Sequence, residues 1–519
     1  MEDSAKGRDS FKEYLDDESG SVAIIIKQQL RPAEGPDGVV FPPTYPISLH
    51  SNNNDYGRKN NKEDKEENKE EKGKSGYNID PLKDGNICEI DSPQSQANRI
   101  EPLFKVIKNG KLVPQITITV REDGEKINLL DAGHRSADAL VRFSSIVPLT
   151  HKAFEQVKKG NHLAIAQIAP TSLLFGVWDS RGTRVKIQRI IKAEIRATNV
   201  EELKRSSVFN PAIDYVTDGG VDEKHDKQNG PKNPLSRHGM KHALDTRAVG
   251  GVLVRGDIIR TVNINLVAIR GLKAFTDGVF DLEKTRQLQE YILGLALLSA
   301  TYNHPSALNL REGCHLCHDN NKKEMCVSKA VYLTGEEKPF TCDAKDIEAY
   351  AEQSAKAFFG ERYDRKDIPD AVFEANVANE FLGMSEKDQD KLACSGPITK
   401  EAIQAFKEKN SDPIKLIIDA VKEVKDRLPK KSKGKNIVPT IDAEIFTDVR
   451  RILNDLESDD TTKESIVQLV QELSGIVDSG QDAHSIVKEC NDKLGEFKKK
   501  KKASQAEGAA DKASEDSIS

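Results

Sequence analysis

The 519-residue sequence has little of several features that mark common protein classes. It contains one tryptophan, 5% aromatic residues and seven unevenly spaced cysteines, so it does not build a disulfide framework. The longest apolar run, YILGLALLSA at 291–300, is half as long as the ~20 residues that a membrane span needs. The first residues, MEDSAKGRDSFKEYL, include no apolar core of the signal-peptide type. These absences predict a cytoplasmic protein with no membrane association.

Polar segments interrupt the chain, which is 37% hydrophobic and 31% charged. Residues 1–21 are predicted to be a flexible N-terminus. Residues 51–76 contain one aromatic and no aliphatic residue, and seven Lys/Arg offset seven Asp/Glu there. Such a segment cannot offset its ordering entropy, so it is predicted to be a disordered insertion. Residues 498–519 form a predicted disordered tail, whose KKKKK run either contacts nucleic acid or, more in keeping with the acidic residues that follow, keeps the end solvated.

Between these segments, residues 22–342 combine strand and helix patterns. Residues 22–48 have β-branched runs punctuated by Pro and Gly, which predicts short strands and turns. Within 250–272, Val262 and Ile264 alternate with Asn263 and Asn265, as in a strand with one buried face. Residues 134–145 are predicted to form a helix, and Asp281 is predicted to cap a long amphipathic helix that follows it. The fold class predicted for this region is α+β.

The hydrophobic pattern changes beyond residue 342, and residues 343–497 are predicted to form an all-helical region. The segments 412–428, 443–457 and 463–477 each carry apolar residues at helical spacing, and Pro413 suits a first helical position. We therefore expect at least three helices, which pack either as a bundle of their own or as part of the core of the preceding region.

Local charge differs from global charge. Residues 130–210 contain thirteen Lys/Arg and seven Asp/Glu, a net charge of +6 inside a chain of −6. In VKIQRIIKAEIRA (185–197), Ile187, Ile191 and Ile195 share one parity while Lys186, Lys192 and Arg196 share the other, which predicts a single strand with a cationic face. A positive stripe is typical of proteins that hold a phosphate backbone, and Trp178 offers a ring for stacking on bases. The alternative is a solvated sheet face with Trp178 in the core, and spacing alone leaves both open.

Several separate stretches carry a family resemblance. In chain order they are CEIDSPQSQANRIEP (88–102), LLDAGHRSADALVRFSS (129–145), PTSLLFGVWDSRGT (170–183), IIKAEIRATNVEELKRSSVFNPA (190–212), GGVLVRGDIIRTVNINLVAIRGL (250–272) and NLREGC (309–314). Together they closely resemble the backbone-subunit family of CRISPR-associated RAMP proteins, in the branch of type I-G (formerly I-U) systems. The resemblance covers about 22–50 and 77–318.

The resemblance implies a modified RRM-like (ferredoxin-type) palm with insertions in residues 22–342. It implies a subunit that polymerises along CRISPR RNA in a Cascade-like complex and presents the guide for pairing with target DNA, so that base pairing reads the sequence. Its implied partners are CRISPR RNA, target DNA through the guide, copies of itself and other effector subunits. The region beyond about 345 has no counterpart in the family, although its helical pattern is similar to that of the small subunits of related effectors. The candidate RNA-binding residues are His134, Arg135, Arg142, Trp178, Arg181, Arg184, Lys186, Lys192 and Arg196.

His134 is the basis of an alternative function. Some RAMP proteins are endoribonucleases that process precursor CRISPR RNA with a histidine, and a general base needs a positioned partner and a reacting group. The sequence shows neither, so we expect a non-enzymatic protein in which His134 contacts RNA or a helix start.

A cysteine-rich stretch offers a candidate metal site. GCHLCHDNNKKEMC (313–326) places Cys314, Cys317 and Cys326 near two histidines, and four such ligands can close a tetrahedral zinc site. The second half of the stretch lacks a paired spacing, which favours ordinary reduced cysteines and no cofactor over zinc.

Overall fold

The computed structural model describes residues 11–46, 75–121, 124–226, 233–245, 249–302, 308–341, 343–364, 370–410, 464–477 and 485–497, together with single helical residues between 417 and 453. The chain divides into two compact units, Met1–Thr399 and Lys400–Ser519. None of the described helices is long and apolar enough to cross a membrane. The mixture of helices and antiparallel strands in the first unit confirms the predicted α+β class.

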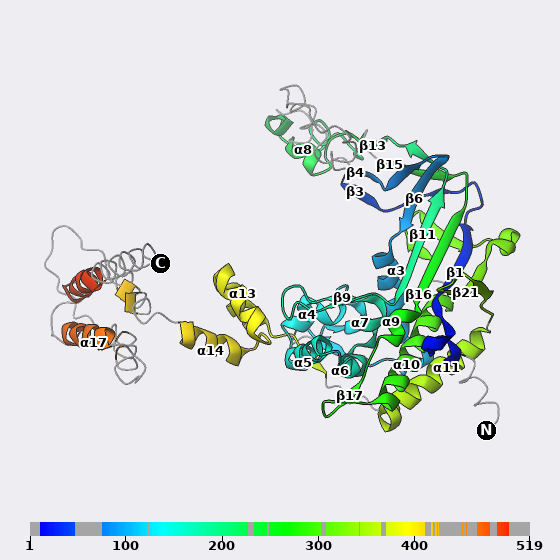
Figure 1. The fold of residues 1–519 in the computed structure, drawn as a ribbon. Helices are drawn as coiled ribbons and strands as arrows, with labels where there is room; N and C mark the ends of the chain where they lie inside the picture. The colour runs from blue at the N-terminus through cyan, green and yellow to red at the C-terminus, as the bar shows by residue number, and fades with distance from the viewer. Residues whose placement is uncertain are drawn as a thin grey trace, which may run out of the picture. The chain divides into compact units, whose positions relative to one another are not determined.

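A long antiparallel sheet is the framework of the first unit (Figure 1). Its strands run in the order β19-β20-β1-β16-β11-β6-β5, and β21 pairs with both β1 and β22. The bounds of these strands are β1 (Ser21–Pro32), β5 (Ile79–Leu82), β6 (Gly85–Asp91), β11 (Ile191–Thr198), β16 (Ile258–Asn265), β19 (Asn309–Arg311), β20 (Cys314–His318), β21 (Val327–Tyr332) and β22 (Glu337–Pro339).

One face of this sheet is covered and the other is open, because side chains alternate along each strand. In β11, Ile191 and Ile195 are 2% and 0% exposed, while the intervening Lys192 is exposed. β16 follows the same alternation, and its register places Ile264 opposite Ile191 and Asn263 opposite Lys192. The alternation predicted within 250–272 is therefore confirmed for Val262, Asn263, Ile264 and Asn265 of β16.

Helices share one core with the apolar face. They are α3 (Pro93–Ile100), α5 (Val147–Lys158), α6 (Leu163–Ile168), α7 (Pro170–Phe175), α9 (Leu266–Arg270), α10 (Leu282–Thr301) and α11 (Ala344–Phe359). The helices α3, α7, α9 and α10 contact the sheet, and α11 packs on α10. The predicted long helix after Asp281 is confirmed as α10, and the Asp281 carboxylate accepts a hydrogen bond from the Lys284 backbone N–H at 2.9 Å.

The packing of α11 shows that the domain boundary predicted at 342/343 lies elsewhere. Tyr291 of α10 stacks on Phe358 of α11 with ring centres 4.8 Å apart. Gly294 allows close approach, since a Cβ there would lie 2.9 Å from the Cα of Ala351. Residues 343–399 thus belong to the first unit, and the boundary lies at 399/400 rather than 342/343. Helical periodicity shows that a helix has an apolar face, but not which surface covers that face.

The second unit has its own helices and core. It contains α14 (Lys400–Asn410), α17 (Glu464–Val477) and a helix over 485–497. Leu469 and Leu473 of α17 pack with Val487 and Leu494, and also with Val421. The predicted helix at 463–477 is confirmed, whereas most of 412–428 and 443–457 lies outside the described residues.

Three further predictions differ from the structure: those for the N-terminus, for the insertion and for the helix over 134–145. The segment predicted to be a flexible N-terminus includes two 3₁₀ turns, Lys12–Leu15 and Asp17–Ser19, and Phe11 is 3% exposed with its ring 4.9 Å from that of Tyr350. Apolar side chains among the charged residues hold this stretch on the core, so the prediction was wrong for residues 11–21. Residues 1–10, 47–74 and 498–519 lie outside the described residues.

The predicted insertion ends too late. Ser75 and Gly76 belong to β4 (Ser75–Tyr77), which pairs with β3 (Thr44–Pro46). The predicted helix over 134–145 is shorter than expected, because this stretch forms a 3₁₀ turn, Arg135–Ala137, and one helical turn, α4 (Ala139–Arg142).

The first unit also contains smaller sheets and helices. One three-stranded sheet consists of β2 (Val39–Val40), β12 (Val200–Lys204) and β15 (Val249–Val254), and another of β7 (Thr117–Thr119), β8 (Lys126–Asn128) and β23 (Ala371–Val372). Two strand pairs are β13 (Ser207–Phe209) with β14 (Ala243–Asp245) and β17 (Phe275–Thr276) with β18 (Val279–Phe280), and the remaining helices include α8 (Pro234–Arg237), α12 (Ala375–Leu382) and α13 (Glu386–Ser395).

Candidate nucleic-acid interface

A groove of about 1110 Å³ lies where the open face of the sheet meets the segment after α7. Its walls include residues of α3, the 133–142 segment, the 175–190 segment, β11 and β16. Seven of the nine predicted RNA-binding residues line it: His134, Arg135, Arg142, Trp178, Arg181, Lys186 and Lys192. The structure therefore brings most of the candidate site together from separate stretches of chain.

The cationic stretch is two strands rather than the predicted one. Lys186 belongs to β10 (Lys186–Ile187), which pairs with β9 (Val177–Trp178), whereas Lys192 belongs to β11. The parity of the isoleucines continues across the break between the strands, which is why the pattern resembles a single strand. Gly176 makes the hairpin possible, because it has φ +78° and a Cβ there would lie 3.1 Å from the Arg189 nitrogen.

Trp178 is on the surface of the groove and not in the core. It is 62% exposed, and the Lys186 ammonium lies 5.7 Å from its ring centre. At this exposure, part of the indole ring is accessible to a planar group such as a base. The alternative interpretation that placed Trp178 in the core is wrong.

Exposed cations differ in how they are paired. Lys192 and Arg196 flank Glu194 and lie 3.1 and 3.2 Å from its carboxylate, so one acid offsets part of the charge of this face. Arg196 does not line the groove, and neither does Arg184, whose guanidinium lies 3.8 Å from the Cys394 sulfur. Arg181, Lys186 and Lys192 are the exposed Lys and Arg residues that line the groove in the described part of the chain.

Arg135 has a structural partner. Its Nε lies 2.7 Å from the Glu101 carboxylate, and both side chains are buried. Its guanidinium also donates to the Gly176 carbonyl at 3.1 Å and lies over the Phe175 ring. Burial raises the pKa of Glu101 to about 7, and the charge of Arg135 opposes this shift. Arg135 thus ties the 133–142 segment to the start of the hairpin.

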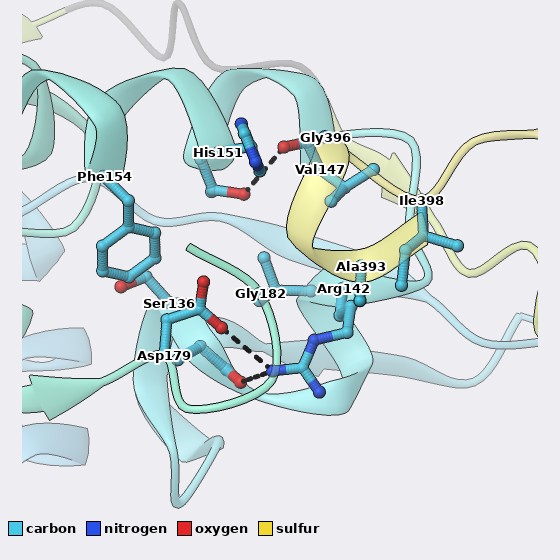
Figure 2. Close-up of a pocket in the computed structure, with 13 residues that line it drawn as sticks. Ser136, Arg142, Val147, His151, Phe154, Asp179, Gly182, Ala393, Gly396 and Ile398 are labelled. Carbon is cyan, nitrogen blue, oxygen red and sulfur yellow. Dashed lines mark hydrogen bonds and ion pairs between the residues drawn. The ribbon is translucent and has the colours of Figure 1, made fainter. Parts of the chain in front are cut away.

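Arg142 is held in a similar way (Figure 2). Its guanidinium points to Asp179 at 3.1 Å and to the Ala137 carbonyl at 3.2 Å. Asp179 also accepts a hydrogen bond from the Thr183 backbone N–H at 2.7 Å. A small cavity of about 30 Å³ adjoins this pair, with Ala393 among the residues on its other side. Arg142 therefore fixes the turn that carries Arg181 and Arg184.

His134 lies at the mouth of the groove and is exposed. Its backbone N–H donates to Asp138 at 3.2 Å. Within the described residues, no hydrogen bond or ion pair holds its imidazole ring. An orienting partner of the kind found in acid–base catalysis is therefore not present among them.

The predicted zinc ligands do not gather. Cys314 is buried and Cys317 lies three residues later in the same strand, β20, so the two thiols point to opposite faces of the sheet. Cys326 is exposed and accepts a hydrogen bond from the Gln29 backbone at 3.5 Å. Among the described residues, no group of three or more His, Cys, Asp or Glu could hold a metal ion. A Cys-x-x-Cys pair suits zinc on a turn, and here it falls on a strand.

The groove also contains residues that the sequence did not single out. Gln94 and Asn98 come from α3, and Asn263 and Asn265 come from β16. The alternation in β16 indicated that the two asparagines face outward, but only the pairing with β11 places Asn263 beside Lys192. Arg189 is half-buried and donates to the Phe175 carbonyl at 3.1 Å. Burial, and then the charge of Arg135, lower the pKa of Arg189.

Buried contacts join the stretches of sequence that carry the family resemblance. Asp91 is fully buried and binds Arg99 at 3.1 Å and Arg311 at 2.9 Å, which joins the stretches at 88–102 and 309–314. Arg260 donates to Gln96 at 3.0 Å and so joins the stretch at 250–272 to α3.

No curated protein matches the chain. Residues 24–202, which supply most of β1, all of β6 and β11 and most of the groove, match the model of the family described as CRISPR-associated protein GSU0053 (Cas_GSU0053), so this part of the chain is similar to a CRISPR-associated family.

Proposed function

We propose that this protein is a CRISPR RNA-binding backbone subunit of a type I-G (I-U) Cascade-like complex. It coats the guide in successive copies and presents its bases to target DNA alongside other effector subunits in the cytoplasm. The groove described above carries this proposal, because it combines an exposed indole, three exposed cations and amide side chains in one channel. Single-stranded nucleic acid is bound by this combination of stacking platform and positive groove.

The topology supports an RRM-like palm. β1, β11, β16 and β21 follow one another with helices between β1 and β11 and between β16 and β21. Setting aside the inserted small elements, this is the β-α-β-β-α-β order of ferredoxin-type folds. All neighbouring pairs among these four strands are antiparallel, and the face away from the helices is open. An open sheet face of this kind is the RNA-binding surface of RRM domains.

A scaffold role agrees better with the groove than catalysis does. The groove has its cations and aromatic ring in place, whereas the His134 ring has no orienting partner among the described residues. Endoribonuclease activity remains the alternative, in which His134 abstracts the proton of a 2′-hydroxyl group.

Purified protein and labelled RNA separate the two. The scaffold predicts a salt-sensitive shift of single-stranded RNA with no cleavage, and loss of that shift when Arg181, Lys186 and Lys192 are changed to alanine. The nuclease predicts metal-independent cleavage within the CRISPR repeat that His134→Ala abolishes. Intact RNA bound equally well by the wild type and the triple variant would refute the scaffold proposal.

For the second unit we propose a role like that of a helical small subunit, which contacts target DNA or a neighbouring subunit. Its separate apolar core supports an independent module. The likeness is one of architecture alone.

A further inference from the structure

A second cavity, of about 720 Å³, lies between α5, α6, the loop 105–115 and the segment 359–363. It shares no lining residue with the nucleic-acid groove. Small-molecule sites commonly have volumes of roughly 300–1,000 Å³. The cavity is therefore of the right size for a bound metabolite, and neither the family match nor the proposed function assigns it a role.

The cavity is positively charged. Its lining includes Lys105, Lys111, Lys152 and Arg362, and none of its described lining residues is Asp or Glu. Lys105 is neutralised by Asp131, 2.6 Å away. Lys152 and Arg362 are exposed and make no ion pair within the described chain. An anionic group is the ligand chemistry that these two side chains favour.

The interior of the cavity offers apolar and amide surface. Phe359 is held by an edge-to-face contact with Tyr291, with ring centres 5.3 Å apart, and its ring lines the cavity. Leu149, Lys152, Ala153 and Gln156 line the cavity from one side of α5, because spacings of three and four residues link them along the helix. Gln156 and Gln167 add amide groups. A flat ring with a polar edge fits such a lining.

One rim of the cavity is strained and firmly held. Lys108 and Asn109 are consecutive non-glycine residues in the left-handed region, with φ of 49° and 56°. The Gln115 side chain fastens the loop by donating to the Gly110 and Val113 carbonyls, both at 3.1 Å. Backbone strain of this kind clusters at ligand sites. The rim is thus built to one shape before any ligand arrives.

We propose that this cavity binds a nucleotide unit, with the base against Phe359 and the phosphate toward Lys152 and Arg362. A free nucleotide and the terminal nucleotide of a strand present the same chemistry. A protein segment is less well matched, because Leu149, 42% exposed, is the one large exposed apolar side chain among the described residues that line the cavity.

Isothermal titration calorimetry on the full-length chain tests the proposal, with ATP, adenosine, inorganic phosphate and a short single-stranded oligonucleotide as separate probes. ATP or the oligonucleotide should bind with a Kd below about 1 mM, and the double variant Lys152→Glu/Arg362→Glu should bind at least about tenfold more weakly. Ala164→Leu fills the cavity without changing charge and should also weaken binding. Lys159→Glu, at the C-cap of α5 and outside the lining, should leave binding of either probe within about twofold. Lys186→Ala, in the groove, should leave ATP binding within about twofold, whereas it should weaken oligonucleotide binding through the groove.

Each result of the titrations either supports the proposal or overturns it. Binding of ATP identifies a free nucleotide as the source, and binding of the oligonucleotide alone, weakened by the cavity variants, identifies a strand end. Absence of heat with both probes at millimolar concentration would overturn the proposal. Equal weakening by Lys159→Glu, or equal weakening of ATP binding by Lys186→Ala, would also overturn it, as would phosphate binding as tightly as ATP. Oligonucleotide binding that the cavity variants leave unchanged, without ATP binding, would overturn it as well, because such binding belongs to the groove. The RNA shift assay on the same variants reports separately on the groove.

Discussion

The three exposed groove cations should set how steeply RNA binding depends on salt. For single-stranded nucleic acid, log affinity falls against log salt with a slope of about −0.7 per neutralised phosphate. Arg181, Lys186 and Lys192 would therefore contribute a slope of about −2, which corresponds to a loss of about 20-fold in affinity between 50 and 200 mM salt. The contribution is this small because Arg135 and Arg142 are paired with buried carboxylates.

Fluorescence polarisation of a labelled single-stranded RNA at several salt concentrations measures this slope. Changing all three residues to alanine should make it shallower by about 2, since each lost phosphate contact removes nearly one unit. The matched control is the triple alanine variant at Lys126, Lys158 and Lys338, which are 53%, 45% and 54% exposed. None of these three lines the groove. An unchanged slope in the groove variant, or an equal change in the control, would refute the reasoning.

Three other perturbations have distinct expected outcomes. Trp178→Ala should weaken RNA binding about 5- to 150-fold, the value of one base stack at roughly 1–3 kcal/mol, with no change in melting temperature because the ring is outside the core; a lower melting temperature would contradict this. Replacing 47–74 by a short Gly/Ser linker should leave the melting temperature nearly unchanged, because Pro46 and Ser75 are paired across β3 and β4 and so hold the ends together; a large loss would show that the segment stabilises the fold. Chain 1–399 should be soluble and bind RNA, whereas chain 1–342 should aggregate by exposing the α10 surface that α11 covers; circular dichroism and light scattering distinguish these results, and a well-behaved 1–342 would restore the earlier boundary.

Patterns among neighbouring residues predicted individual strands and helices. They did not predict which distant strands and helices pack against one another. The alternation in β16 and the cap before α10 depend on neighbouring residues, so both were predictable. The register of β11 against β16 joins residues some seventy positions apart, and no periodicity encodes it. Asn263 therefore entered the site only with the structure. The same limit applies to α11, whose apolar face suits a separate bundle as well as it suits α10.

The cationic side chains of this region are of two kinds in the fold: some are paired with carboxylates in the interior, and others are exposed. Arg135 and Arg142 looked like Lys186, yet each lies against a carboxylate in the interior, where loss of one partner commonly costs about 3–5 kcal/mol. Their contacts fix Gly176 and the turn at Asp179, and the exposed group between those two points is Trp178. Arg135 and Arg142 thus hold the β9–β10 hairpin in position. Trp178, which is exposed on that hairpin, is available to contact a ligand. A substitution at Arg142 should consequently act on RNA through the position of Trp178 and Arg181, and should lower stability as well as affinity, which a direct phosphate contact at an exposed residue would not do.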